Sequence, residues 1–86
     1  MPEKPVTISF HARFEMRRRG ITEAQAIGVV RHAEQIVPSR RGRQIHQSRI
    51  MGGNLLLRVI VKEAAVAYHV VTAYKTSKIA KYWKRT

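Results

Sequence analysis

The spacing of the apolar residues changes near Glu34, and this change constrains the fold more than any other feature of the sequence. Before Glu34, apolar residues recur at the three- and four-residue spacing of a helix. After it, short runs rich in valine, isoleucine and leucine are separated by proline or glycine. The pattern predicts helices first and a sheet second, which is typical of an α+β domain.

The first helix is expected to run from a cap at Ser9 or Thr7 to about Arg19, where Gly20 gives the backbone the freedom to end it. Helical spacing places Phe10, Phe14 and Arg17 on one stripe, and the apolar side is widened by Ala12 and Met16. A second stripe is polar and contains His11, Glu15 and Arg18.

A second helix is expected to begin at a capping box formed by Thr22 and Gln25 and to run to about His32. Four strands follow, over residues 35–37, 44–51, 55–62 and 65–74, and a short helix begins at Ser77. We therefore predict one domain over residues 1–86, with two N-terminal helices packed on a four-stranded, mainly antiparallel sheet. The opposite face of that sheet is expected to be partly open to a ligand.

The charge of the chain indicates what that ligand is. Seventeen lysines and arginines face five glutamates and no aspartate, which gives a formal net charge of +12. So large an excess repels itself within a small domain, whereas it attracts phosphates. A polyanion is therefore the expected partner, and an anionic membrane surface or an acidic protein is the alternative.

Several chemistries are not expected from the residues present. The chain has no cysteine, its four histidines are dispersed, and no glycine-rich phosphate loop is followed by a helix. We expect no metal and no cofactor. No run of residues approaches the ~20 apolar positions of a membrane span, so we expect a cytoplasmic protein without a membrane partner.

The chain does contain the groups needed to cleave RNA without a metal. That reaction needs a base for the 2′-hydroxyl, an acid for the leaving oxygen, and cations or hydroxyls beside the phosphorane. A histidine side chain can act as base or acid near neutral pH, which makes His11 a candidate. Thr72 and Tyr74 can donate hydrogen bonds, and Arg58, Lys75 and Lys78 can face phosphate oxygens.

Two segments resemble a known family. Ser9-Phe10-His11-Ala12-Arg13, Met16 and Arg19-Gly20-Ile21-Thr22 are similar to the opening of small domains grouped with RelE-like toxins, and Val70-Val71-Thr72-Ala73-Tyr74 is similar to their closing signature. The wider group unites RelE with barnase, EndoU and colicin D-type tRNases. The resemblance implies a metal-free endoribonuclease that acts on mRNA or tRNA and is neutralised by an acidic antitoxin or immunity protein. It also implies that His11 is the general acid/base and that Thr72 stabilises the transition state.

Further residues are candidates for contact with RNA, and each has a simpler interpretation. The basic positions are Arg18, Arg19, Arg40, Arg41, Arg43, Lys75 and Lys78, which can equally be solvated charge. His46 is a candidate for a second acid or base, whereas His69 is interpreted as a packed core histidine. Thr72 can be an ordinary strand residue, and Tyr74 can close the edge of the core.

One inconsistency concerns the last strand. In a regular strand, Thr72 and Tyr74 share a face, and His69 and Lys75 share the other. All four can face one cleft only if the strand is bulged or ends between them. Two other functions therefore stay open: a non-catalytic RNA- or DNA-binding module, and an interaction protein that holds an acidic partner.

Overall fold

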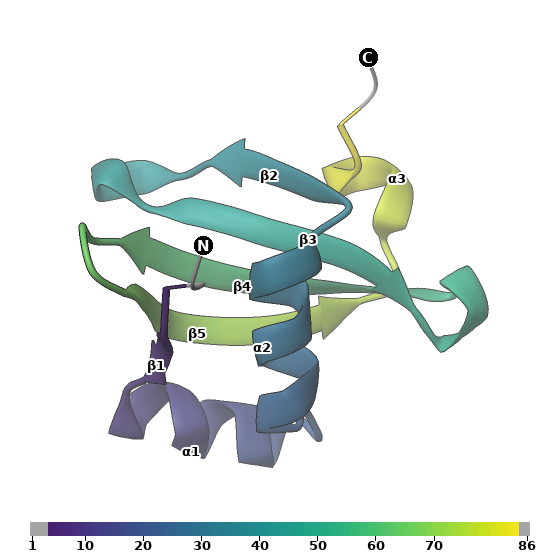
Figure 1. The fold of residues 1–86 in the computed structure, drawn as a ribbon. Helices are drawn as coiled ribbons and strands as arrows, with labels where there is room; N and C mark the ends of the chain where they lie inside the picture. Colours follow the sequence, from purple (N-terminus) through teal and green to yellow (C-terminus); the bar gives the residue numbers. More distant parts are fainter. Residues whose placement is uncertain (1–3, 85–86) are drawn as a thin grey trace.

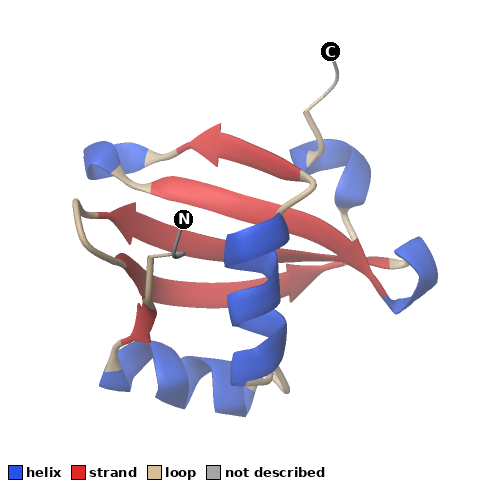
Figure 2. Ribbon diagram, in the orientation of Figure 1, coloured by secondary structure: helices blue, strands red, loops and turns tan. Residues whose placement is uncertain are grey.

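The computed structural model describes residues 4–84, and this part of the chain forms three α-helices and one five-stranded sheet (Figures 1 and 2). In chain order the elements are β1 (Val6–Ile8), α1 (Phe10–Arg18), α2 (Glu23–His32), β2 (Gln35–Pro38), β3 (Gln44–Ile50), β4 (Leu55–Glu63), β5 (Tyr68–Thr76) and α3 (Ile79–Tyr82). Single 3-10 turns at Arg40–Gly42 and Met51–Gly53 connect β2 to β3 and β3 to β4. The predicted α+β class is confirmed.

The sheet has the strand order β1-β5-β4-β3-β2, and its details differ from the prediction. Strands β2 to β5 are antiparallel to their neighbours as expected, but β1 is a fifth strand that runs parallel to β5, with Val6 opposite Tyr68. The expectation of four strands was wrong because β1 has only three residues. Such a segment is too short to show a period, and its partner lies about sixty positions further along the chain.

The starts of both N-terminal helices agree with the prediction. Ser9 caps α1 by accepting a hydrogen bond from the backbone N–H of Ala12 at 3.0 Å. Thr22 and Gln25 form the expected capping box, with both reciprocal bonds at 3.0 Å. Gly20 has a φ of +70° just after α1, which is the left-handed conformation that glycine adopts without strain.

The rotation of α1 about its axis differs from the expected one. Ala12 and Met16 are buried, but Phe10 is 85% exposed and Phe14 is 58% exposed. The small side chain of Ala12 lets α1 approach β5, and Arg19 at the helix end hydrogen-bonds the backbone of that strand. Both contacts require the phenylalanines to face away from the sheet, so only part of the predicted apolar side is core.

The core lies between the sheet and the two N-terminal helices. In Figure 1, α2 crosses one face of the sheet and α1 runs along β5. Leu57, Val59 and Val61 of β4 are fully buried against these helices, as the alternation in this strand predicted. The short helix α3 lies against the opposite face, which is therefore only partly open. Within residues 4–84, no helix has the length and apolar character needed to cross a membrane.

Candidate nucleic-acid interface

A bulge in β5 determines which side chains share the open face of the sheet. Val61 pairs with Val70 and Ile60 pairs with Thr72, so that Val71 has no partner on β4. The extra residue reverses the alternation between Val70 and Thr72. Directly opposed residues share a face, so the open face of β5 carries His69, Thr72 and Tyr74, opposite Lys62, Ile60 and Arg58 of β4.

The bulge resolves the conflict in strand parity for His69 but not for Lys75. Lys75 lies opposite Leu57 and is therefore on the face covered by the helices. Its Nζ donates a 3.4 Å hydrogen bond to the carbonyl of Gly20 at the end of α1. Lys75 thus compensates the negative end of that helix and does not belong to the open face.

The side chain of Arg58 is nearly buried in the centre of the open face, at 7% exposure. Its Nε donates to Oε1 of Gln47 at 2.9 Å, its Nη1 donates to the hydroxyl of Tyr74, and its guanidinium lies 4.2 Å from the ring centre of Tyr82. Because the Tyr74 hydroxyl accepts from Arg58, its own hydrogen is still free to be donated outward. Arg58 therefore orients the hydroxyl of Tyr74.

The neighbouring glutamines attach α3 to this face. Gln47 is fully buried, and its Nε2 donates to Oε1 of Gln35 at 2.8 Å and to the carbonyl of Tyr82 at 3.2 Å. Gln35 in turn donates to the carbonyl of Lys84 and accepts from its backbone N–H. Beside them, the guanidinium of Arg49 lies 4.7 Å from the ring centre of Trp83. The β2–β3 end of the open face is therefore closed.

The β5 edge of the open face remains accessible. Beyond Val70, β5 has no pairing partner on its outer side, because β1 ends at Ile8. Arg19 reaches this edge from the end of α1: its Nη1 donates to the carbonyl of Ala73 at 2.8 Å and lies 3.4 Å from the hydroxyl of Thr72. Arg19 and Thr72, both candidates from the sequence, are thus in contact.

His11 is not in contact with Thr72. Its imidazole is exposed near the start of α1 and forms no hydrogen bond or ion pair with another residue of the described range 4–84. His11 precedes Arg19 by eight residues, which is about 12 Å along a helix axis. Since His11, Glu15 and Arg19 are each four residues apart, His11 lies on the same side of α1 as Arg19.

The environments of the other two candidate histidines are the reverse of the expected ones. His46 is 2% exposed beneath α2, where its Nδ1 donates to the carbonyl of Val30 at 3.0 Å. Burial lowers the pKa of His46 below its usual value, although the Val30 carbonyl opposes this effect. The burial leaves His46 no surface with which to contact RNA. His69, expected in the core, is exposed, and its Nδ1 lies 2.6 Å from the hydroxyl of Thr7.

The remaining basic candidates lie at the surface around the sheet. Arg40 and Arg41 are exposed in the 3-10 turn after β2, Arg43 is partly buried beside them, and Lys78 is exposed before α3. Arg18 is exposed on α1, and its Nε lies 3.4 Å from a carboxylate oxygen of Glu15. Of these residues, Lys78 lies next to the end of β5, where its backbone N–H donates to the hydroxyl of Thr76 at 3.0 Å.

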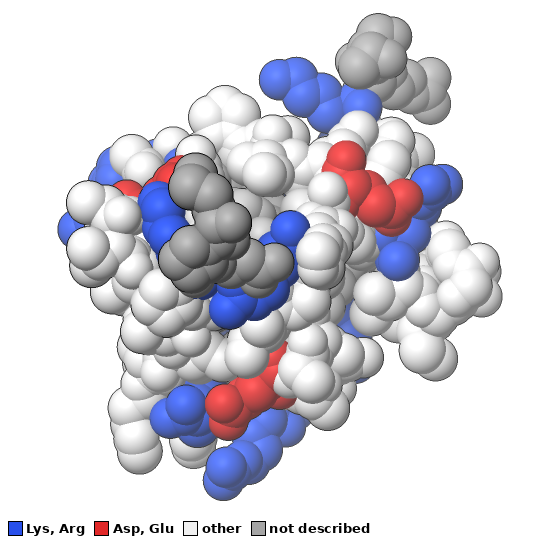
Figure 3. Space-filling view, in the orientation of Figure 1, with Lys and Arg blue, Asp and Glu red and all other residues white. Residues whose placement is uncertain are grey.

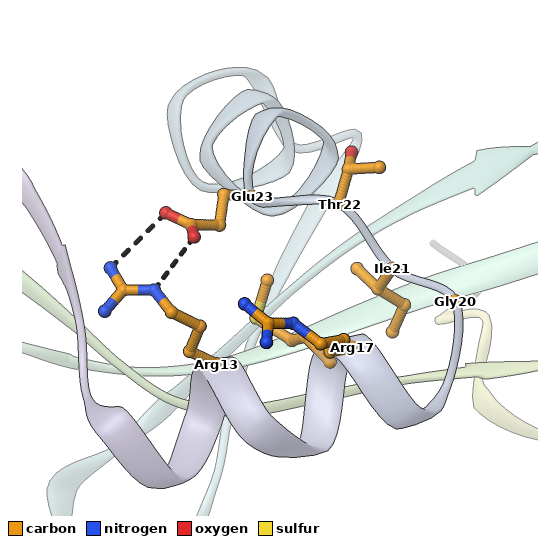
Figure 4. Close-up of a pocket in the computed structure, with 7 residues that line it drawn as sticks. Arg13, Arg17, Gly20, Ile21, Thr22 and Glu23 are labelled. Atoms are coloured by element: carbon orange, nitrogen blue, oxygen red, sulfur yellow. Dashed lines mark hydrogen bonds and ion pairs between the residues drawn. The ribbon is translucent and has the colours of Figure 1, made fainter.

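A groove of about 340 Å³ lies between α1 and the start of α2 (Figure 4). Arg13 and Arg17 line it from α1, but Arg13 forms an ion pair with Glu23 at 2.8 Å. Glu23 already places a carboxylate at the positive end of α2. The groove is thus a poor site for a phosphate.

Few carboxylates oppose the cationic surface. Each glutamate between residues 4 and 84 lies within 4 Å of one lysine or arginine, in the pairs Lys4–Glu63, Arg13–Glu23, Arg18–Glu15 and Arg49–Glu34. In Figure 3, which views the helix-covered side, red carboxylates lie beside blue side chains, and blue gathers at the lower end, where α1 lies. Within residues 4–84, the lysines and arginines thus outnumber the carboxylates available to pair with them.

Comparisons of this chain with family models, with curated proteins and with solved structures gave no match. Within residues 4–84, no three histidine or glutamate side chains gather closely enough to hold a metal ion.

Proposed function

We propose that this protein binds RNA along the open face and free edge of β5. The observation that carries the proposal is the bulge at Val71, because it places His69, Thr72 and Tyr74 on one accessible face while Arg19 reaches the adjacent edge. Tyr74 offers a ring for stacking and a hydroxyl for phosphate, and Arg19 offers a cation. No glutamate is on this face of β4 or β5.

Electrostatics supplies most of the expected affinity. A chain of charge +12 in which few cations are paired attracts phosphate without regard to sequence, and its binding weakens steeply as salt rises. The β5 surface adds the local contacts that fix where the RNA strand lies. This combination favours a single strand over a duplex, because unstacked bases can reach the ring of Tyr74.

The test is the affinity for a fluorescein-labelled single-stranded RNA of mixed sequence, measured by anisotropy over a series of salt concentrations. Arg19→Gln is compared with Arg17→Gln, which removes the same charge from the outer side of α1. We expect Arg19→Gln to weaken binding about tenfold and to reduce the salt slope by about 1, and Arg17→Gln to have a much smaller effect. Equal losses in the two variants would show that net charge alone binds the RNA.

We propose metal-free cleavage of mRNA or tRNA as a second function of the same surface, as the resemblance to RelE-like toxins implies. The observation that favours it is the exposed imidazole of His69 on the face of Thr72 and Tyr74. In this reaction the 2′-oxygen loses its proton to a base and attacks phosphorus. The bond from phosphorus to the 5′-oxygen breaks, and an acid protonates that oxygen. Tyr74, oriented by Arg58, and Thr72 would donate to the phosphorane oxygens.

The cleavage proposal is tested with total RNA in excess chelator, followed by detection of 2′,3′-cyclic phosphate and 5′-hydroxyl ends. We expect wild-type protein to generate these ends, and His11→Ala and His69→Ala identify which imidazole acts. Intact RNA with wild-type protein would reject cleavage, although binding in the anisotropy experiment would stand. Undiminished cleavage by His11→Ala would remove His11 from the mechanism.

A further inference from the structure

The outer side of α1 carries both phenylalanines of the chain, and both are in solvent. Phe10 is 85% exposed and Phe14 is 58% exposed. Together with Arg13 and Arg17 they enclose a shallow pit of about 70 Å³. A small soluble domain rarely leaves two adjacent aromatic rings exposed without a partner, because their burial is among the largest gains available at an interface.

We propose that this side of α1 binds an acidic, amphipathic helix of a partner protein. Residues four apart on a helix form the ridge that packs into the groove of a second helix, and Phe10 and Phe14 form such a ridge. Apolar residues of the partner spaced i and i+4 would cover the two rings. The position of the pit between the rings gives these residues a place to insert.

The charge around the ridge determines the chemistry of the partner. Arg13 and Arg17 border the pit, and Arg18 continues the basic surface toward the end of α1. Arg13 already pairs with Glu23, and Arg18 lies beside Glu15. Arg17 is therefore the arginine open to a carboxylate of the partner, which it can bind in a planar, two-pronged geometry. A second copy of this chain is disfavoured, because it would bring a second charge of +12 to the same contact.

The shape of the ridge favours a helix over RNA at this position. Single strands bind where several ring faces line a groove that tracks the backbone, whereas the convex side of α1 presents only the two rings of Phe10 and Phe14. The surface is also distinct from the proposed RNA site. Arg19 and the buried Ala12 face β5, so the phenylalanines point away from it.

The experiment uses a labelled synthetic peptide of 18 residues that forms a helix with leucine on one side and glutamate beside it. Its affinity for the full chain is measured by anisotropy and compared with that of a scrambled peptide of identical composition. The variants are Phe10→Ala/Phe14→Ala and Arg17→Gln. Their matched controls are Val66→Ala, which shortens a residue that is 76% exposed in the β4–β5 turn, and Arg40→Gln, which removes the same charge elsewhere.

We expect the amphipathic peptide to bind more tightly than the scrambled one, and the double phenylalanine variant to weaken it about tenfold while its melting temperature is unchanged. Arg17→Gln should cost more affinity than Arg40→Gln. Equal binding of the two peptides, or equal losses in variants and controls, would overturn the proposal. The proposal would also be overturned if the phenylalanine variant weakened RNA binding more than peptide binding. It would be overturned as well if the wild-type protein sedimented as a dimer and this variant as a monomer.

Discussion

Leu57 and Arg58 are consecutive residues of β4, and they project to opposite faces of the sheet. Leu57 is fully buried among aliphatic side chains from α1, α2 and β5. Arg58 is almost as buried, but it is enclosed by Gln47, Tyr74 and Tyr82. One face is thus held by apolar packing that many sequences would satisfy, and the other by directional contacts that require particular partners.

The largest loss of stability is expected for a substitution on the covered face. Leu57→Ala removes a fully buried side chain and should lower the free energy of unfolding by about 2–5 kcal/mol, because a cavity adds to the lost apolar burial. Leu55→Ala, at a half-buried position in the same strand, is the matched control and should cost less. Urea denaturation followed by circular dichroism measures both. Equal losses would mean that the packing on the covered face is not tight.

On the open face, Arg58→Met should lower the free energy of unfolding by about 1–3 kcal/mol, because the buried Oε1 of Gln47 loses its donor. A second change, Gln47→Leu in the same chain, removes the unpaired acceptor but also the donor to Gln35 and to the Tyr82 carbonyl, so it should not restore the stability. If Arg58→Met alone is as stable as the wild type, directional contacts do not hold this face. The same denaturation measurement decides between these outcomes.

The dependence of stability on pH should be a smaller effect, and it should arise from His46 on the covered face. Burial lowers the pKa of His46 in the folded protein, so the unfolded chain binds a proton more readily. The contribution to stability is therefore present above the unfolded pKa of about 6.5 and is lost as pH falls below it toward the lowered folded value. Melting temperatures between pH 7.5 and pH 5 should fall in the wild type and fall less in His46→Gln.

Glu34 and Glu63 do not account for the loss of stability between pH 7.5 and pH 5. Hydrogen bonds from Arg49 hold the pKa of Glu34 below its usual value, and Lys4 does the same for Glu63. The stability from these pairs is present above the unfolded pKa of about 4.5 and is lost as pH falls through the lower folded values. A slope that begins only below pH 5 would therefore assign the pH dependence to the glutamates.

The sequence predicted the covered face of the sheet better than the open face. Caps at Ser9 and Thr22 and the alternation in β4 are local patterns, and they predicted the helices and the buried face correctly. Strand β1 was missed because its pairing with β5 is non-local. The rotation of α1 was not predicted. It is determined by Ala12, whose small side chain lets the helix approach β5 closely, and ranking residues by hydrophobicity does not identify such a contact.

The candidate site was less predictable, because one residue decides it. Whether His69 joins Thr72 and Tyr74 depends on the unpaired Val71, and a valine within a valine-rich strand gives no signal of a bulge. The contact of Arg19 with Thr72 joins residues 53 positions apart. No spacing rule relates such residues, so the chemistry of the groups was predictable but their assembly was not.

The smallest predicted effect lies at the β1 end of the open face, where the Thr7 hydroxyl and His69 Nδ1 are 2.6 Å apart in solvent. Thr7→Val keeps the shape of the side chain and should cost about 0.5 kcal/mol, since water can replace an exposed hydrogen bond. In a His69→Ala background that cost should fall to what the weaker bond from the Thr7 hydroxyl to the Tyr68 carbonyl at 3.4 Å supplies, and the double-mutant cycle isolates the pair. A coupling as large as the loss in Arg58→Met would show that this end is as rigid as the end closed by α3. A small coupling means that His69 can turn toward a ligand, as its place in the proposed RNA surface requires.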